Sequence, residues 1–342
     1  MFKMAKKDIP NMLTLLGESM DVYAPVKKGK LTNFEDFTEG AELDIDTLKT
    51  VKSPKDFFLP QVENLFSATS QGKEINIEAK ALRDKPFVIF GVRSCDVRAM
   101  EILDSVYLSE PVDKFYEARR ENGIILSLAC NEPGQTCFCT TFNIDPAHPN
   151  ADGAMWVIND NIYIEARTEK GENLVKLISK FLQEGSKNEI VQSQTAIREK
   201  LNKLPYSDLS LDGLEGNQLL DLFDTPQWEE LHKTCLACGI CTFICPTCQC
   251  YDIKDYDTGG EVVRYRCWDS CMYSDFTLMA HGNIRNSQKE RFRQRFMHKL
   301  VYHPDNNKGE ISCVGCGRCV NKCPSSLNIV KVIKSLAVKC NV

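Results

Sequence analysis

The sequence lacks the features that would identify it as a membrane protein, a nucleotide-binding enzyme or a nucleic-acid-binding protein. No segment approaches the roughly 18 consecutive apolar residues of a membrane helix, and the apolar stretch 12–16 is too short for a signal sequence. Neither a G-x-G-x-x-G nor a P-loop motif occurs, and no nucleophile–base pair is recognisable. The net charge of -5 gives no indication of a nucleic-acid or membrane partner. We therefore expect a cytoplasmic protein that carries out no bond chemistry of its own.

Cysteine, in contrast, is abundant: 17 of the 342 residues are cysteines. An odd number cannot pair completely into disulfides, and nothing marks the chain as secreted. In a reducing cytoplasm, clustered cysteines usually bind metal. With 43% hydrophobic and 26% charged residues, the rest of the composition is that of an ordinary protein with room for two domains.

Twelve cysteines lie between residues 235 and 323, and eight of them form one motif written twice. The copies are Cys235-x2-Cys238-x2-Cys241-x3-Cys245-Pro246 and Cys313-x2-Cys316-x2-Cys319-x3-Cys323-Pro324. Three thiolates at this spacing let one loop surround a 4Fe-4S cubane, while the fourth cysteine ligates the other cluster in two-cluster proteins. The predicted ligands of cluster 1 are Cys235, Cys238, Cys241 and Cys323, and those of cluster 2 are Cys313, Cys316, Cys319 and Cys245. Zinc is the weaker alternative, because a tetrahedral ion needs neither the third cysteine of each copy nor the proline.

Three glycines stand inside these motifs: Gly239, Gly315 and Gly317. Glycine has no Cβ, so it allows the backbone to come close to another group. We expect these glycines to let the backbone approach inorganic sulfide.

The motifs begin 78 residues apart, which is too far for a small ferredoxin built on a short repeat. The insert is predicted to be largely helical, with helices over 275–281 and 289–301. We therefore expect an all-α, helical ferredoxin-like domain over 229–342. One face of the second helix carries Arg291, Arg293, Arg295 and Lys299. This face is either solvated, a docking surface, or a source of positive charge that balances anionic clusters; RNA binding is a weak further alternative.

The first part of the chain, 1–228, alternates between strand and helix patterns and is predicted to be an α/β domain. Apolar runs over 86–91 and 124–129 are typical of strands buried on both faces of a parallel sheet, with a helix between them. A strand pair over 155–158 and 162–166 and a helix over 171–181 follow. The polar, cysteine-free segment 186–230 contains the predicted boundary, which we place near Trp228.

Four cysteines of this α/β domain are expected to converge. Cys95 and Cys130 each follow a predicted buried strand, and the ends of parallel strands in a right-handed β-α-β unit emerge at one edge of the sheet, where such folds bind ligands. Cys137 and Cys139 come shortly afterwards and point the same way in extended chain. We predict a third 4Fe-4S cluster here; the alternative is that these thiols are buried as small hydrophobic side chains.

The remaining cysteines give a weaker pattern. Cys248, Cys250, Cys267 and Cys271 form C-x-C followed by C-x3-C, which leaves open a fourth metal centre, packing or a redox-active thiol pair. Cys340 is expected to be a residue of the tail. The histidines add little, although His232 stands beside the first motif.

Several segments resemble one family of iron–sulfur proteins. They are Gly91-Val92-Arg93-Ser94-Cys95-Asp96, Leu128-Ala129-Cys130 through Cys137-Phe138-Cys139, Cys245-Pro246-Thr247-Cys248, Trp268-Asp269-Ser270-Cys271 and Arg293-Gln294-Arg295-Phe296-Met297-His298-Lys299. Over roughly 50–335 the chain resembles the iron–sulfur beta subunits of cytoplasmic nickel–iron hydrogenases (sulfhydrogenases). It is also similar to an iron–sulfur subunit of anaerobic sulfite reductase and to the iron–sulfur subunit of flavin oxidoreductases coupled to heterodisulfide reductase.

The resemblance implies an electron-transfer subunit of a multi-subunit complex from anaerobic metabolism. A partner would carry flavin and bind NAD(P), and this chain would relay electrons to a catalytic subunit of hydrogenase, heterodisulfide reductase or sulfite reductase type. An alternative is a catalytic iron–sulfur reductase whose N-terminal cysteine site binds substrate. The resemblance also includes Cys248, Cys250 and Cys271 but not Cys267, which weakens the case for a fourth cluster.

Overall fold

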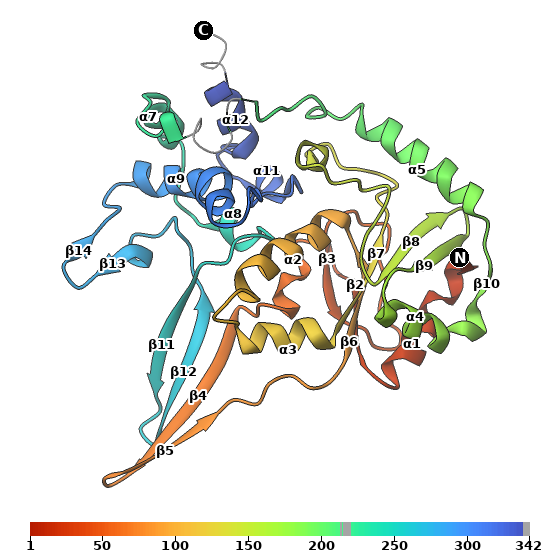
Figure 1. Ribbon diagram of the computed structural model, residues 1–342, viewed down its shortest axis with the longest axis horizontal. Coiled ribbons are helices and arrows are strands. Elements are labelled where there is room, and N and C mark those ends of the chain that lie inside the picture. Colours follow the sequence, from red (N-terminus) through yellow and green to blue (C-terminus); the bar gives the residue numbers. More distant parts are fainter. Residues whose placement is uncertain (213, 215–219, 338–342) are drawn as a thin grey trace.

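The computed structural model describes residues 1–212, 214 and 220–337, so Cys340 lies outside the described residues. Its largest element is an eight-stranded mixed sheet in the order β10-β1-β9-β8-β7-β6-β2-β3 (Figure 1). In chain order the strands are β1 (Phe2–Ala5), β2 (Asp21–Lys28), β3 (Leu31–Asp36), β6 (Phe87–Val92), β7 (Gly123–Leu128), β8 (Gly153–Ile158), β9 (Asn161–Ala166) and β10 (Gln183–Glu184). The predicted strands over 86–91, 124–129, 155–158 and 162–166 are thus confirmed, and the N-terminal region is a mixed α/β sheet structure.

Helices cover both faces of this sheet. On one face α1 (Ile9–Gly17) and α4 (Glu169–Leu177) pack against alternate residues of the central strands, such as Val88 and Phe90. On the other face α2 (Ser94–Tyr107) and α3 (Lys114–Asn122) pack against the intervening residues, and α5 (Lys187–Leu201) packs beside them against Trp156. Strands β2, β6, β7 and β8 run parallel, so their carboxyl ends meet at one edge of the sheet.

A second sheet extends from the body as an arm (Figure 1). It has the order β11-β12-β4-β5 and is antiparallel throughout, with β4 at Val62–Gln71, β5 at Glu74–Ala79, β11 at Tyr251–Asp257 and β12 at Glu261–Trp268. β12 pairs with β4 along its whole length, so segments nearly 200 residues apart in sequence form one sheet. At its base, Arg266 of β12 forms buried ion pairs with Glu63 and Asp113.

The C-terminal part contains α7 (Gln227–His232), α8 (Ile240–Phe243), α9 (Gln288–Met297), α10 (His303–Asn306), α11 (Arg318–Lys322) and α12 (Ile329–Ala337). The predicted helix over 289–301 is confirmed as α9 and the π-helical turn His298–Tyr302 that continues it. Its side chains Phe292 and Phe296 are buried against Trp228 of α7. The apolar face of this helix therefore forms the core of the C-terminal part.

Two expectations for the C-terminal part are not met. Residues 251–268 form β11 and β12, so the structure does not confirm an all-α C-terminal region. The predicted helix over 275–281 is wrong: Asp275–Thr277 is a short 3-10 turn, followed by the two-residue strands β13 (Leu278–Met279) and β14 (Gly282–Asn283). Leu278 and Met279 are exposed, so no apolar face is available there to support a helix. Among the described residues, no helix has the length and apolar character needed to span a membrane.

Candidate functional site: three groups of cysteines

The first motif and the last cysteine of the second motif line one cavity. Its wall contains Cys235, Cys238, Cys241 and Cys323. Cys235 and Cys238 come from the loop that leads into α8, and Cys241 is the second residue of α8. Gly239, at the start of this helix, has a φ of +72°, a conformation that glycine adopts without steric cost. Cys323 arrives from the end of α11, and its Sγ accepts a hydrogen bond from the backbone N–H of Leu327 at 3.2 Å. These are the four cysteines predicted for cluster 1.

The second motif and the last cysteine of the first motif line a neighbouring cavity. Cys313 and Cys316 come from the loop before α11, Cys319 is the second residue of α11, and Cys245 comes from the segment after α8. Helices α8 and α11 lie against each other, so each motif delivers its fourth cysteine to the other motif's cavity. These are the four cysteines predicted for cluster 2.

The chemistry of these thiols fits iron–sulfur clusters better than a single ion. Among the described residues, no three Cys, His, Asp or Glu side chains gather closely enough to hold one metal ion, whereas four sulfurs line each cavity. Burial raises the pKa of Cys313 to about 12 and that of Cys316 to about 11, so these thiols ionise readily only beside added positive charge. Iron in a cubane would supply that charge.

Two buried cations contact the cavities from α9 and the turn after it. Arg295 lines both cavities, and Lys299 lines the second only. The Nζ of Lys299 lies 3.4 Å from the Sγ of Cys245 and donates hydrogen bonds to Thr247 Oγ1 at 2.7 Å and Ser312 O at 2.9 Å. The basic residues of this helix therefore have different surroundings: Arg295 and Lys299 line the cavities, whereas Arg293 pairs with Asp224.

The third group of cysteines gathers at the carboxyl edge of the main sheet, where β6 and β7 end. The guanidinium of Arg93, directly after β6, donates a hydrogen bond to Ala129 O after β7 at 2.8 Å and so joins the two strand ends. Burial raises the pKa of Cys130 to about 11; the charge of Arg93 opposes this rise and the nearby Cys137 adds to it. Burial and the charges of Cys130 and Cys137 likewise raise the pKa of Cys139.

Cys95 belongs to the same neighbourhood but stands nearer the second cavity. Burial raises its pKa strongly, and Asp96, Cys316 and Cys139 are among the charges that act on it. It packs with Cys139 and Cys316 in one apolar cluster. The four thiols predicted for a third cluster thus lie in one region, with Cys95 on the side toward Cys316.

The third group and the second cavity share a boundary made of backbone. The N–H of Phe138 donates a hydrogen bond to Gly315 O at 2.9 Å, and a Cβ added at Gly315 would lie 2.4 Å from Phe138 O. A Cβ at Gly317 would lie 2.2 Å from Thr136 O. The sequence predicts that these glycines let the backbone approach inorganic sulfide; in addition, the structure shows that the 136–139 loop occupies the space beside Gly315 and Gly317.

A buried ion pair fastens the same boundary. Arg318, at the start of α11, binds both carboxylate oxygens of Asp96, the third residue of α2, at 2.6 and 2.7 Å. Both side chains are almost fully buried. The sequence gives no reason to pair these two residues, although the position of Arg318 two residues after Cys316 places it beside the second site.

The weaker group of cysteines is brought together only in part. Cys248 lies beside Cys245, and Cys250 lies beside Cys271, with hydrogen bonding within each pair that lowers the pKa of Cys245 and Cys250. Cys267 lies on β12 of the arm, more exposed to solvent than the other three.

Two further side chains differ from what the sequence indicates. Lys55 is buried beside the weaker group with its Nζ 2.7 Å from Cys248 O, and no local pattern in the sequence marks it. His232 stands next to the first motif in the sequence, but its ring contacts Trp228 O within α7 and does not line the first cavity.

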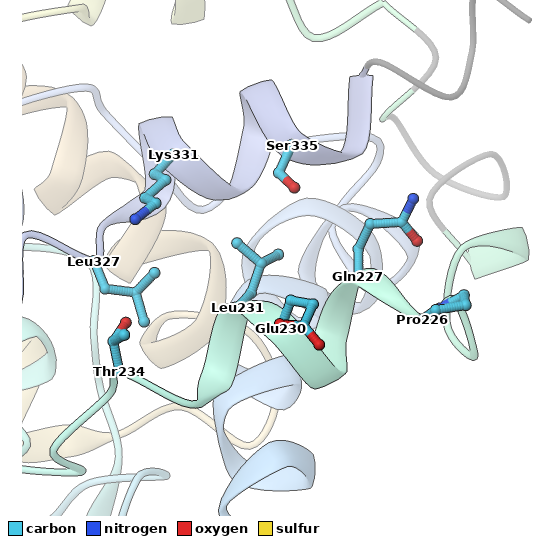
Figure 2. Close-up of a pocket in the computed structure, with 8 residues that line it drawn as sticks. All are labelled: Pro226, Gln227, Glu230, Leu231, Thr234, Leu327, Lys331 and Ser335. Carbon is cyan, nitrogen blue, oxygen red and sulfur yellow. The ribbon is translucent and has the colours of Figure 1, made fainter.

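An open groove lies beside the first cavity, between α7 and α12 (Figure 2). Its volume is about 630 Å³. Leu231 and Leu327 form much of its apolar surface, while Glu230 and Lys331 stand at its sides (Figure 2). Leu327 lines both the groove and the first cavity, so the two are adjacent. The first cavity thus approaches the surface at this groove, and Cys238 is exposed there.

Comparison with known proteins agrees with this geometry. Residues 234–327 match the family described as a 4Fe-4S dicluster domain, so the C-terminal part contains a domain of that class. The chain is also 33% identical over 334 residues to sulfhydrogenase 2 subunit beta of Pyrococcus furiosus, an alignment that covers 97% of this chain and 96% of that protein. The chain therefore belongs to the sulfhydrogenase beta-subunit family. The alignment extends well into residues 1–50, a segment that contributed little to the family resemblance recognised from the sequence. No solved structure matches.

Proposed function

We propose that this chain is the electron-transfer subunit of a hydrogenase-type complex and holds two 4Fe-4S clusters in its C-terminal part. The observation that carries the proposal is the crossed arrangement of the motifs: three cysteines of each line a cavity together with the fourth cysteine of the other. Cluster 1 would be held by Cys235, Cys238, Cys241 and Cys323. Cluster 2 would be held by Cys313, Cys316, Cys319 and Cys245. When bound, such clusters accept and release single electrons.

A third 4Fe-4S cluster on Cys95, Cys130, Cys137 and Cys139 is part of the proposal. It is supported by the position of these thiols at the carboxyl edge of the sheet and by the charge interactions among them. The contact between Phe138 and Gly315 would then set the third and second sites side by side. The chain's contribution is to fix the positions of the three sites relative to one another.

The partners follow from the family. A flavin- and NAD(P)-binding subunit would exchange electrons with one of these sites, and a catalytic hydrogenase subunit with another. The name of the Pyrococcus furiosus relative favours hydrogenase over heterodisulfide reductase or sulfite reductase as the catalytic partner. Purifying the native complex anaerobically through a tag on this chain, then measuring nickel, sirohaem and flavin, tests this assignment. Sirohaem without nickel would contradict it.

Single cysteine substitutions test the cluster assignment. Cys245→Ser and Cys241→Ser are expected to damage different clusters, although both residues lie in the same motif. Iron and sulfide content and electron paramagnetic resonance of the reduced protein provide the measurement. Cys267→Ser, on the arm, is the matched control and should leave both signals unchanged.

Each outcome has a defined reading. Loss of the same cluster in Cys245→Ser and Cys241→Ser would contradict the crossed ligation. Purified anaerobic protein that contains zinc in place of iron and sulfide would contradict the proposed function as a whole. For the third site, Cys130→Ser should remove about a third of the iron while both C-terminal signals persist, and unchanged iron would exclude that cluster.

A further inference from the structure

We infer that Arg295 is a charge shared by the two C-terminal clusters and holds the reduction potentials of both above the values they would otherwise have. The inference rests on the proposed function, since it requires both cavities to contain clusters. Its structural basis is position: among the charged side chains that line the two cavities, Arg295 is common to both, whereas Lys299 lines the second only.

The guanidinium of Arg295 is buried without protein counter-charge. The side chain is 4% exposed, and no carboxylate in the described part of the chain lies within ion-pair distance of it. Its Nε is buried without a hydrogen-bond partner among the described residues. Such a charge is strongly unfavourable unless something negative is bound beside it. Arg318, the other buried arginine at these cavities, has its carboxylate in Asp96.

Cysteines of both cavities lie close enough to act on Arg295. Burial opposes its charge, but Cys241 of the first cavity, Cys319 and Cys245 of the second, and Cys248 beside Cys245 raise the pKa of the guanidinium. The ring of Phe296, 4.8 Å from the guanidinium carbon, holds the side chain in place. Arginine suits this position because it remains charged when buried and has several donors in a fixed plane.

The consequence for electron transfer follows from charge. Reduction adds a negative charge to a cluster, so a nearby fixed cation stabilises the reduced form and raises the potential. A cation common to both cavities raises both potentials together, without changing either set of ligands. The difference between the two potentials then depends on groups that act on one site only, such as Lys299 at the second cavity.

The test is redox titration of the full-length, cluster-loaded chain, followed by electron paramagnetic resonance. In Arg295→Gln, both C-terminal clusters should shift to more negative potentials. We expect at least a tenfold lower ratio of reduced to oxidised cluster at a fixed potential, which corresponds to about 59 mV for a one-electron couple. Lys299→Met should shift the second cluster alone. Arg293→Gln, on the same helix but paired with Asp224 away from the cavities, is the matched control and should shift neither.

The outcomes separate this inference from the proposed function. Wild-type protein without two clusters would refute the proposed function, whereas two clusters whose potentials do not move in Arg295→Gln would refute the inference alone. A shift of only one cluster would also overturn it. If Arg295→Gln binds no iron, the variant Arg295→Lys, which keeps the charge, decides. Potentials equal to those of the wild type support a role of the charge, whereas potentials that are more negative by about 59 mV reject it.

Discussion

Replacing Asp96 with asparagine is expected to lower the melting temperature of the protein substantially, because it leaves the guanidinium of Arg318 buried without its counter-charge. The two carboxylate oxygens of Asp96 lie 2.6 and 2.7 Å from Arg318, and the two side chains are only 1% and 4% exposed. Removing one partner of a buried ion pair costs about 3–5 kcal/mol. At roughly 2 °C per kcal/mol for a chain of this size, the expected decrease is about 6–10 °C. Thr50, whose carbonyl oxygen accepts from Arg318 at 3.2 Å, offsets only part of this cost.

The matched control is Asp255→Asn on the arm. Asp255 binds Arg264 in the same two-oxygen geometry, with both distances 2.7 Å, but the two side chains are 48% and 44% exposed. Exposed ion pairs contribute little to stability, so this variant should have the same melting temperature as the wild type. Differential scanning fluorimetry under anaerobic conditions, with iron measured in every sample, compares the two. Removing both charges in Asp96→Asn/Arg318→Met should restore much of the loss, and equal melting of Asp96→Asn and Asp255→Asn at equal iron content would refute the reasoning.

Two further predictions concern the same region. Gly315→Ala should destabilise the protein far more than Gly309→Ala. Both residues have positive φ, but of the two only Gly315 would place the new Cβ against backbone, 2.4 Å from Phe138 O. Equal melting temperatures of the two variants would contradict the role given to that contact. The free energy of unfolding should decrease as the pH falls from 6.5 to about 5. Burial, followed by the charges of Lys299 and His303, lowers the pKa of His298 from 6.5 to about 4, so the unfolded chain binds a proton at a higher pH than the folded chain does. This loss is about 2 kcal/mol over that interval, and His298→Gln should reduce it whereas the exposed His281→Gln should not, as measured by denaturant unfolding at each pH.

The features that sequence predicted correctly depend on short spacings and strong periodicity. Strands 86–91 and 124–129 are almost entirely apolar, which is the pattern of buried parallel strands, and the structure confirms them. The grouping of the C-terminal cysteines follows from a motif whose fourth cysteine ligates the other cluster in two-cluster proteins, so Cys245 and Cys323 were expected at the opposite sites. In both cases the relevant information lies within about ten residues of sequence.

The features that sequence did not predict depend on contacts between distant segments. Strands β11 and β12 had a local signal, since Ile253, Val262 and Val263 are β-branched and Gly259-Gly260 marks a turn, but their pairing with β4 has none. Lys55 is buried only because the arm folds over it, with Trp268 3.8 Å from its Nζ. The pairing of Arg318 with Asp96 likewise depends on where α2 and α11 come to lie.

These distant contacts determine how the cysteine groups are related. The C-terminal cavities are attached to the α/β sheet structure by the β4–β12 pairing, the Arg318–Asp96 ion pair and the hydrogen bond from Phe138 to Gly315. A flexible linker would let the distance between the groups vary, and electron transfer depends steeply on that distance. Loops tied together through backbone and a buried ion pair keep it fixed. Under the proposed function, the close approach at Gly315 would therefore also serve electron transfer, because it fixes the separation of the third group of cysteines from the second cavity.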